Sequence, residues 1–96
     1  MYARVVNIRF PPDMRDEVVR VGSALTPILR SQRGFTSLKV LTDPGAGEGM
    51  IVSFWETEAD AEASEASPLY IGQMSMMSSF LYEPLTPKTQ EVSVRI

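Results

Sequence analysis

The chain of 96 residues contains neither cysteine nor histidine. Without cysteine it can form no disulfide, no thiolate nucleophile and no Cys-ligated metal site. Without histidine it also lacks the commonest metal ligand and the commonest general base of enzymes. We therefore expect no bound metal, and any proton removal must rely on a weaker base or on the acidity of the substrate.

Concentrated positive charge and long apolar runs are also lacking. Nine basic and twelve acidic residues give a net charge of −3, and the basic residues form no cluster. Because phosphate binding requires concentrated Lys and Arg, we exclude nucleic acid as a partner. Neither a signal-peptide pattern nor a run of about 18 apolar residues is present, so we expect no membrane association and a cytoplasmic location.

The composition that remains, 44% hydrophobic and 22% charged, is that of a globular protein, and the length fits one domain over 1–96. Apolar spacings of three and four residues predict a helix from an N-cap at Asp13 to about Arg33-Gly34, and Pro27 is expected to kink or loosen its last turns. β-Branched and aromatic residues predict strands at 3–10, 35–42, 50–55 and 91–96.

A second helical region is expected from about Thr57 to Tyr82, in two pieces. Thr57 is the expected N-cap of the first piece and Ser67 that of the second, with Pro68 at its first helical position. Residues 43–49, with three glycines, are expected to form a hairpin loop. The order βαββαβ predicts an α+β, ferredoxin-like fold with a four-stranded antiparallel sheet.

Side chains alternate across a strand, so each predicted strand divides into two sets by parity. One set is entirely apolar, and if uncovered it would exceed the patch that soluble monomers expose. Both helices of a βαββαβ unit cover the same face, so we predict that a second copy covers this set in a two-fold homodimer. The set comprises Val6, Ile8, Phe10, Leu38, Val40, Met50, Val52, Phe54, Val92, Val94 and Ile96.

The other set mixes apolar and polar side chains and is expected beneath the helices. Buried polar groups are costly unless they are paired or line a cavity, and an apolar cavity with a few polar groups suits a small-molecule ligand. Periodicity does not show which set lies under the helices, so it stays open that the apolar set lies there and the mixed set on the other face. The set comprises Val5, Asn7, Arg9, Phe35, Ser37, Lys39, Leu41, Ile51, Ser53, Trp55, Ser93 and Arg95.

The run Phe-Trp-Glu-Thr-Glu-Ala-Asp-Ala at 54–61 resembles the Trp-Glu-Ser-Glu-Glu-Ala segment of antibiotic biosynthesis monooxygenase-type domains. Arg33-Gly34-Phe35 is similar to the Pro-Gly-Phe of this family, and Pro12-Asp13 and residues 66–70 also agree. The resemblance spans essentially the whole chain. It implies the dimeric α/β-barrel superfamily and oxidation of a small planar substrate, aromatic or polyketide-type, without a cofactor.

The resemblance is incomplete at the positions that carry chemistry. Trp55 matches a Trp that quinone-forming members carry at the end of the third strand, but Ile51 and Ala61 stand where those members have Asn and Tyr. Asn7 is a candidate counterpart of an Asn in haem-degrading members. Their other two functional positions, a Trp and an iron-ligating His, correspond to Ser64 and to a position near Met74. The resemblance therefore implies an oxygenase without haem.

We predict a site with Trp55 and Asn7 as catalytic residues. Trp55 would either stack on a planar ligand or fill the core, and both roles require a partner for its indole N–H. Asn7 would bind a ligand or a backbone group. Arg9 would stabilise an anion or pair with an acid at the sheet edge. The predicted substrate-binding residues are Arg9, Ser53, Tyr70 and Met74, while the acidic residues of 56–65 are expected to form a solvated helix face.

Two other functions stay open. A dimer of the same fold that binds a small molecule without transforming it would explain the missing catalytic side chains. A purely structural dimerisation domain would have a collapsed interior between helices and sheet, with no pocket.

Overall fold

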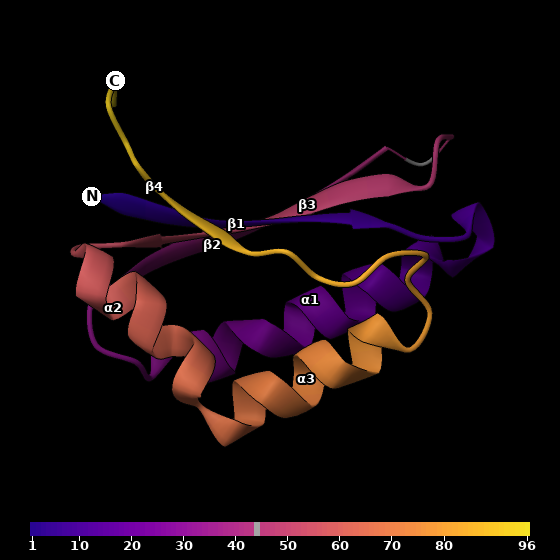
Figure 1. Cartoon of the computed structure of the whole chain (residues 1–96), viewed down its shortest axis with the longest axis horizontal. Coiled ribbons are helices and arrows are strands. Elements are labelled where there is room, and N and C mark those ends of the chain that lie inside the picture. Colours follow the sequence, from indigo (N-terminus) through magenta and orange to yellow (C-terminus); the bar gives the residue numbers. More distant parts are fainter. Residues whose placement is uncertain (44) are drawn as a thin grey trace.

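In the computed structural model, which describes residues 1–43 and 45–96, helices cover one face of a four-stranded sheet (Figure 1). The strand order is β2-β3-β1-β4, and each neighbouring pair is antiparallel. The strands are β1 (Tyr2–Arg9), β2 (Phe35–Asp43), β3 (Glu48–Trp55) and β4 (Lys88–Glu91). This is the predicted ferredoxin-like arrangement, so the fold class is confirmed.

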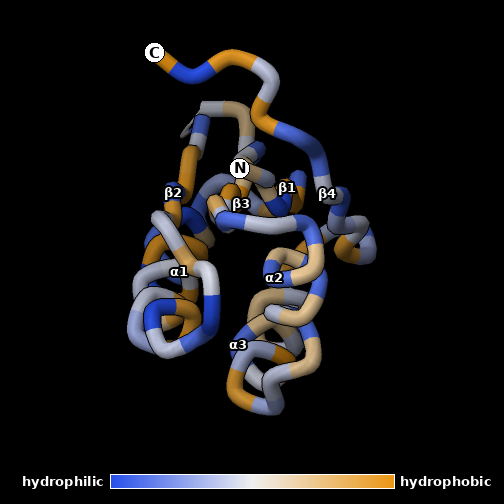
Figure 2. Tube along the Cα trace, turned by 90° about the vertical axis from the view of Figure 1, so that its left-hand side faces the viewer, coloured by the Kyte–Doolittle hydropathy of each residue, from blue (hydrophilic) through white to orange (hydrophobic). Residues whose placement is uncertain are grey.

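The helices lie in a single layer beneath the sheet, with α1 on one side and α2 and α3 on the other (Figure 2). They are α1 (Arg15–Arg30), α2 (Glu58–Ala63) and α3 (Pro68–Ser78). Two short 3₁₀ turns, η1 (Pro12–Met14) and η2 (Ser64–Ala66), precede α1 and α3. The opposite face of the sheet carries no helix among the described residues, and it is called the open face below.

The caps predicted for the second helical region are present. Thr57 Oγ1 accepts a hydrogen bond from the Asp60 N–H at 3.1 Å, and Ser67 Oγ accepts one from the Tyr70 N–H at 3.4 Å. The cap predicted for the first helix was wrong. Asp13 lies inside η1, so it is not placed to cap α1, whose N-cap position is Met14. The helix continues through Pro27 and ends at Arg30.

The last strand is earlier in the chain than predicted. It covers Lys88–Glu91 instead of 91–96, and Glu91 lies opposite Tyr2, the first residue of β1. A single further hydrogen bond joins the Val92 N–H to the Met1 carbonyl at 2.9 Å. Residues 92–96 then leave the sheet, and their end projects from the open-face side (Figure 1).

The strand register corrects the predicted assignment of the two faces. Val6 lies opposite Ile51, and Ile51 lies opposite Val40, so these three side chains share the helix-covered face. Val6, Ile8 and Phe10 are buried in the core and cannot form the dimer face that we predicted for them. Val52 and Phe54 do lie on the open face, whereas Val92 and Val94 lie beyond β4.

The mixed set is divided in the same way. Ile51, Ser53 and Trp55 lie beneath the helices as predicted. A bulge between Phe35 and Ser37 lets Phe35 pack against Trp55 while Ser37 lies opposite Phe54 on the other face. The remaining members on the sheet lie on the open face: Val5, Asn7, Arg9, Lys39 and Leu41.

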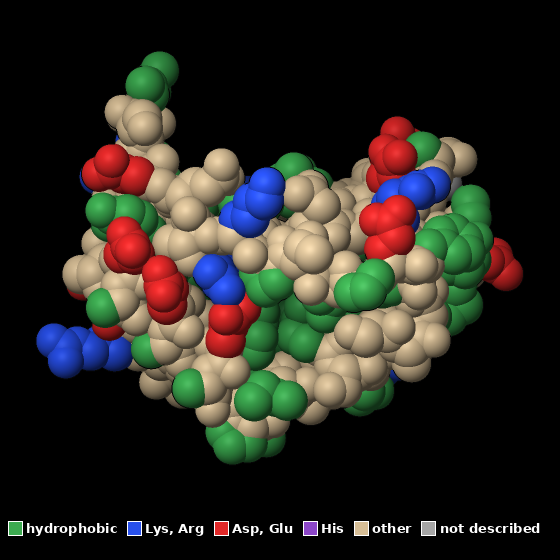
Figure 3. Space-filling view, in the orientation of Figure 1, with side chains coloured by type: hydrophobic (Ala, Val, Ile, Leu, Met, Phe, Trp, Pro, Cys, Tyr) green, Lys and Arg blue, Asp and Glu red, His purple; other side chains and the backbone are tan. Residues whose placement is uncertain are grey.

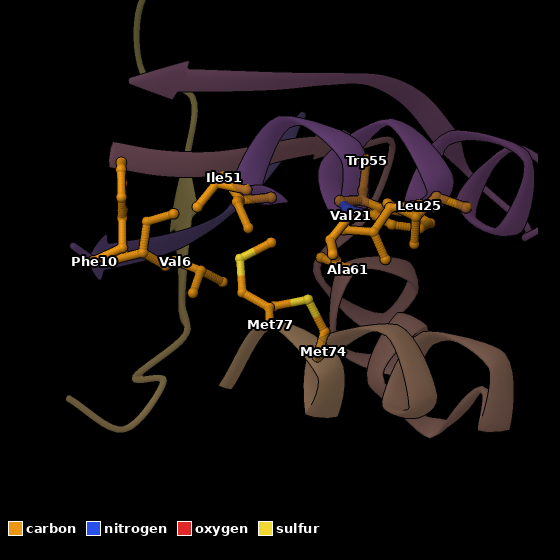
Figure 4. Packing of buried hydrophobic residues seen from close by; sticks show 12 residues of the cluster. Val6, Phe10, Val21, Leu25, Ile51, Trp55, Ala61, Met74 and Met77 are labelled. Atoms are coloured by element: carbon orange, nitrogen blue, oxygen red, sulfur yellow. The ribbon is translucent and has the colours of Figure 1, made fainter. Parts of the chain in front are cut away.

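The core between sheet and helices is apolar and continuous. Val6, Ile51 and Trp55 project from the sheet toward Val21 and Leu25 of α1 and toward the two methionines of α3 (Figure 4). The amphipathic spacing of α1 supplies the largest helical share of it, with Val18, Val21, Leu25 and Leu29. Polar side chains therefore lie mainly outside this core, at the surface or at the edge of the site.

The hairpin loop contains one glycine that the backbone requires. Of the loop predicted at 43–49, Pro44 lies outside the described residues, and Gly47 has φ +66°. The Gly47 carbonyl accepts a hydrogen bond from the Phe10 N–H at 2.8 Å, and a Cβ at Gly47 would lie 2.3 Å from the Phe10 carbonyl oxygen. The loop is thereby fixed to the end of β1.

Gly47→Ala is expected to lower the free energy of unfolding by at least about 1 kcal/mol, because alanine disfavours positive φ and the new methyl meets a carbonyl oxygen. Gly72→Ala is the matched control. Gly72 lies in α3 with open space around it, so the change should stabilise the protein by about 0.5–1 kcal/mol. Urea denaturation measures both, and equal effects would contradict the loop geometry.

Candidate functional site

A cavity of about 280 Å³ lies beside α3, bordered by β1, η2 and the segment that leads into β4. Most of its lining is apolar: Val6, Tyr70, Ile71, Met74, Leu85 and Pro87. Its polar lining comes from Glu65, Ser75 and Ser78. Figure 3 shows hydrophobic side chains gathered in a hollow at the centre of this face, with basic and acidic side chains at its edge.

The start of α3 determines which residues reach the cavity. Ser67 caps the helix and Pro68 occupies its first turn, which fixes the phase of the residues that follow. Tyr70, Met74 and Ser78 then recur at a spacing of four and lie on one helical face. The local sequence signal that starts the helix thus also orients the wall of the cavity.

An ion pair lies at the polar end of the cavity. Arg4 Nε donates to Glu65 Oε1 at 3.2 Å, and Arg4 Nη2 contacts Glu65 Oε2, so the pair is bidentate. The remaining nitrogen, Arg4 Nη1, donates to Thr89 Oγ1 on β4. The Arg4 side chain is 13% exposed and that of Glu65 is 34% exposed. The guanidinium therefore holds the carboxylate in a fixed orientation beside the cavity.

Tyr70 brings a hydroxyl to the same cavity. Burial raises its pKa to about 12 from the ordinary value of 10.0; the negative charge of Glu65 also raises it, and the Arg4 charge opposes the shift. The phenol consequently stays protonated at neutral pH and can donate a hydrogen bond. Both members of the ion pair are close enough to Tyr70 to act on its charge.

Trp55 is completely buried in the core and is not among the residues that line the cavity. Its indole Nε1 donates to Ser53 Oγ at 2.8 Å, so the partner that we expected for this N–H is present. Phe35 meets the indole edge-on, with ring centroids 5.5 Å apart. In this structure Trp55 and Ser53 fill the core at the end of β3, and a catalytic role for Trp55 stays a prediction.

Asn7 and Arg9 lie on the opposite side of the sheet from Tyr70 and Met74. Both are exposed on the open face, so the expectation that they lie beneath the helices was wrong. The reason is the register, because the buried residues of β1 are the even-numbered Val6 and Ile8. Arg9 Nη1 lies 3.0 Å from Glu83 Oε1, which is the edge pairing that we gave as its alternative role.

Two charged residues of the site were not singled out by the sequence. Arg4 has the same strand parity as Val6 and Ile8, so its position under the helices follows only once the register assigns that parity to the helix-covered face. Glu65 was grouped with a solvated acidic face. It is instead half-buried in η2, next to the Ser67-Pro68 break, where it reaches Arg4.

The described residues include no cluster of three or more His, Cys, Asp or Glu side chains that could hold a metal ion. Within 1–43 and 45–96, no helix is both long enough and apolar enough to cross a membrane.

The model of the antibiotic biosynthesis monooxygenase family matches residues 1–71 of the chain. No curated protein matches this chain. The solved structure of a monooxygenase from the ActVA-Orf6 gene of Streptomyces coelicolor, in complex with nanaomycin D, is similar with a TM-score of 0.84 and 18% identity, covering 99% of this chain and 89% of that chain.

Two further solved structures have the same fold. Rv0793 from Mycobacterium tuberculosis has a TM-score of 0.80 and 16% identity, covering 98% of this chain and 96% of that one. NE2512 from Nitrosomonas europaea, a protein of unknown function, also has a TM-score of 0.80 and 16% identity, covering 99% and 91%. At these identities the likeness extends to the fold alone.

Ionisation of Tyr70 provides a test of the site geometry. The difference between the tyrosinate absorbance titrations of the wild type and of Tyr70→Phe should place this ionisation at a pH of about 12. Because the folded-state pKa is raised, the stability that this group contributes is complete below about pH 10 and is lost as the pH rises through about 12. A difference curve centred at the ordinary pKa of 10.0 would show that Tyr70 is not buried beside Glu65.

Proposed function

The chain belongs to the antibiotic biosynthesis monooxygenase family, and we propose that it oxidises a small planar substrate with dioxygen and without a cofactor. The observation that carries this proposal is the cavity of about 280 Å³ against the helix-covered face of the sheet. Its lining is mostly apolar with a few polar groups, which is the character of small-molecule sites. The volume suits a bicyclic or tricyclic aromatic compound better than a large one.

The proposed reaction needs no oxidant other than dioxygen. An electron-rich methylene between aromatic rings loses a proton, and the resulting carbanion reduces dioxygen. One oxygen atom ends in the new carbonyl group and the other leaves as water, so a CH₂ group and O₂ give C=O and H₂O. The protein would bind the substrate, exclude water around it and stabilise its charge.

The residues proposed to act are those that the structure brings to the cavity. Met74 and Val6 would pack on the planar rings, and the Tyr70 hydroxyl would donate a hydrogen bond to the developing oxyanion. Trp55 and Ser53 are buried in the core and do not line the cavity, so they take no direct part in the proposed binding. Asn7 and Arg9, on the open face, do not enter the proposed site of the same chain.

Oxygen uptake with anthrone as the substrate tests the reaction. The wild type should consume oxygen faster than uncatalysed oxidation in buffer. Met74→Trp, which fills the cavity, should lower the rate at least about tenfold, because the substrate can no longer be positioned. Met76→Trp is the matched control. It introduces the same side chain at an exposed position of α3 and should leave the rate unchanged.

No uptake above that of buffer, or equal rates for the two tryptophan variants, would contradict the proposal. Anthrone binding without uptake would favour a second candidate, a binding protein that performs no reaction. One observation supports this candidate. Trp55, the one residue that matches the quinone-forming members, is sealed in the core and has no exposed surface.

We also propose that the chain functions as a homodimer joined through the open face. This face carries apolar side chains with no helix over them, and those that still meet water are Val5, Leu41, Met50 and Phe54, because Ala3 and Val52 are already buried. The exposed residues 93–96 extend on the same side, with Val94 77% exposed. A second copy placed face to face would remove both groups from water, which a closed two-fold arrangement allows.

Sedimentation at micromolar concentration tests the dimer. The wild type should sediment as a dimer, and Phe54→Glu should weaken association at least about a hundredfold, because an unpaired charge would be buried at the interface. Leu69→Glu, on the exposed face of α3, is the control and should remain dimeric. A monomeric wild type, or equal dissociation of both variants, would contradict the interface.

A further inference from the structure

The Arg4–Glu65 pair presents an unusual chemistry to the cavity. Arg4 Nε and Nη2 are both engaged by Glu65, and Nη1 is engaged by Thr89. Three of the five guanidinium N–H groups are therefore engaged by protein acceptors, and Glu65 lines the cavity whereas Arg4 does not. What remains for a ligand is the acceptor capacity of the Glu65 carboxylate, since each oxygen has more than one lone pair.

The surrounding polar groups do not supply a compensating cation. Of the lining residues, only Tyr70, Ser75 and Ser78 carry hydroxyls, and among the described residues no protein partner engages the Tyr70 hydroxyl. A ligand hydroxyl could donate to Glu65 while accepting from Tyr70. A ligand carboxylate could accept from Tyr70, but it would face the Glu65 carboxylate without a donor between them.

We propose that Glu65, held in place by Arg4, determines ligand specificity in this cavity by accepting a hydrogen bond from a hydroxyl group and by rejecting carboxylates. This inference rests on the proposed function, because both place the ligand in the same cavity. It adds the class of ligand: a neutral, planar, hydroxyl-bearing molecule. A ligand carboxylate is rejected because its negative charge repels that of Glu65, and such repulsion is strong in a partly buried site. Specificity then comes from disfavouring the wrong ligand.

The arrangement also predicts what removal of the carboxylate does. Glu65→Gln leaves an amide that cannot neutralise Arg4, so the cavity gains a cation with donors free for a ligand. The preference should then shift toward carboxylates. Glu65→Asp keeps the charge on a shorter side chain and should keep the preference for hydroxyls.

Isothermal titration without oxygen, using 2-naphthol and 2-naphthoate as probes, tests the proposal. The wild type should bind 2-naphthol at least about tenfold more tightly than 2-naphthoate. Glu65→Gln should reduce this ratio at least about tenfold, mainly by improving 2-naphthoate binding. Glu62→Gln, which removes the same charge from an exposed position on α2, is the control and should leave the ratio unchanged.

Equal or tighter binding of 2-naphthoate by the wild type would overturn the proposal, as would binding of neither probe or equal effects of the two glutamine variants. The wild-type comparison requires no variant to fold, so the proposal is tested even if Glu65→Gln is unstable. Binding is measured without turnover. Selective 2-naphthol binding in a protein that consumes no oxygen would therefore contradict the proposed reaction and support this inference.

Discussion

The pairing register of β3 with its two neighbours determines which side chains face the helices, and both the core and the site depend on it. Val6 opposite Ile51, and Ile51 opposite Val40, place one apolar set beneath α1 and α3. A shift of one residue would move every side chain of β3 to the other face. Trp55 and Ser53, which share a face of β3, would then leave the core together.

This register separates two surfaces with different chemistry. Beneath the helices, the apolar layer stops short of the polar end of the cavity, where Arg4 and Glu65 are joined and Tyr70 supplies a hydroxyl. On the open face, Asn7 and Arg9 are mixed with apolar residues and meet solvent or a partner. The helix-covered side is therefore the place for a ligand, and the open side is the place for a second copy.

Local signals in the sequence were sufficient for most of the fold. The hydroxyls of Thr57 and Ser67 start the helices where their types predict, because capping involves only residues three positions away. The register could not be predicted from the sequence, because the loop predicted at 43–49 contains three glycines and does not define where its two strands end. The end of β4 could not be predicted from the local sequence either, since it depends on the pairing of β4 with β1. Arg4 and Glu65, separated by 61 residues, meet only in the folded chain.

The most direct test of the register is a methyl NOE experiment on the isotope-labelled protein. The account predicts cross-peaks between the methyl groups of Val6 and Ile51, and between each of these and Met77 of α3, because all three belong to the buried core. It predicts none between Val6 and Val52, which lies on the other face. Cross-peaks from Val6 to Val52, with none to Ile51, would contradict the register and with it the location of the site.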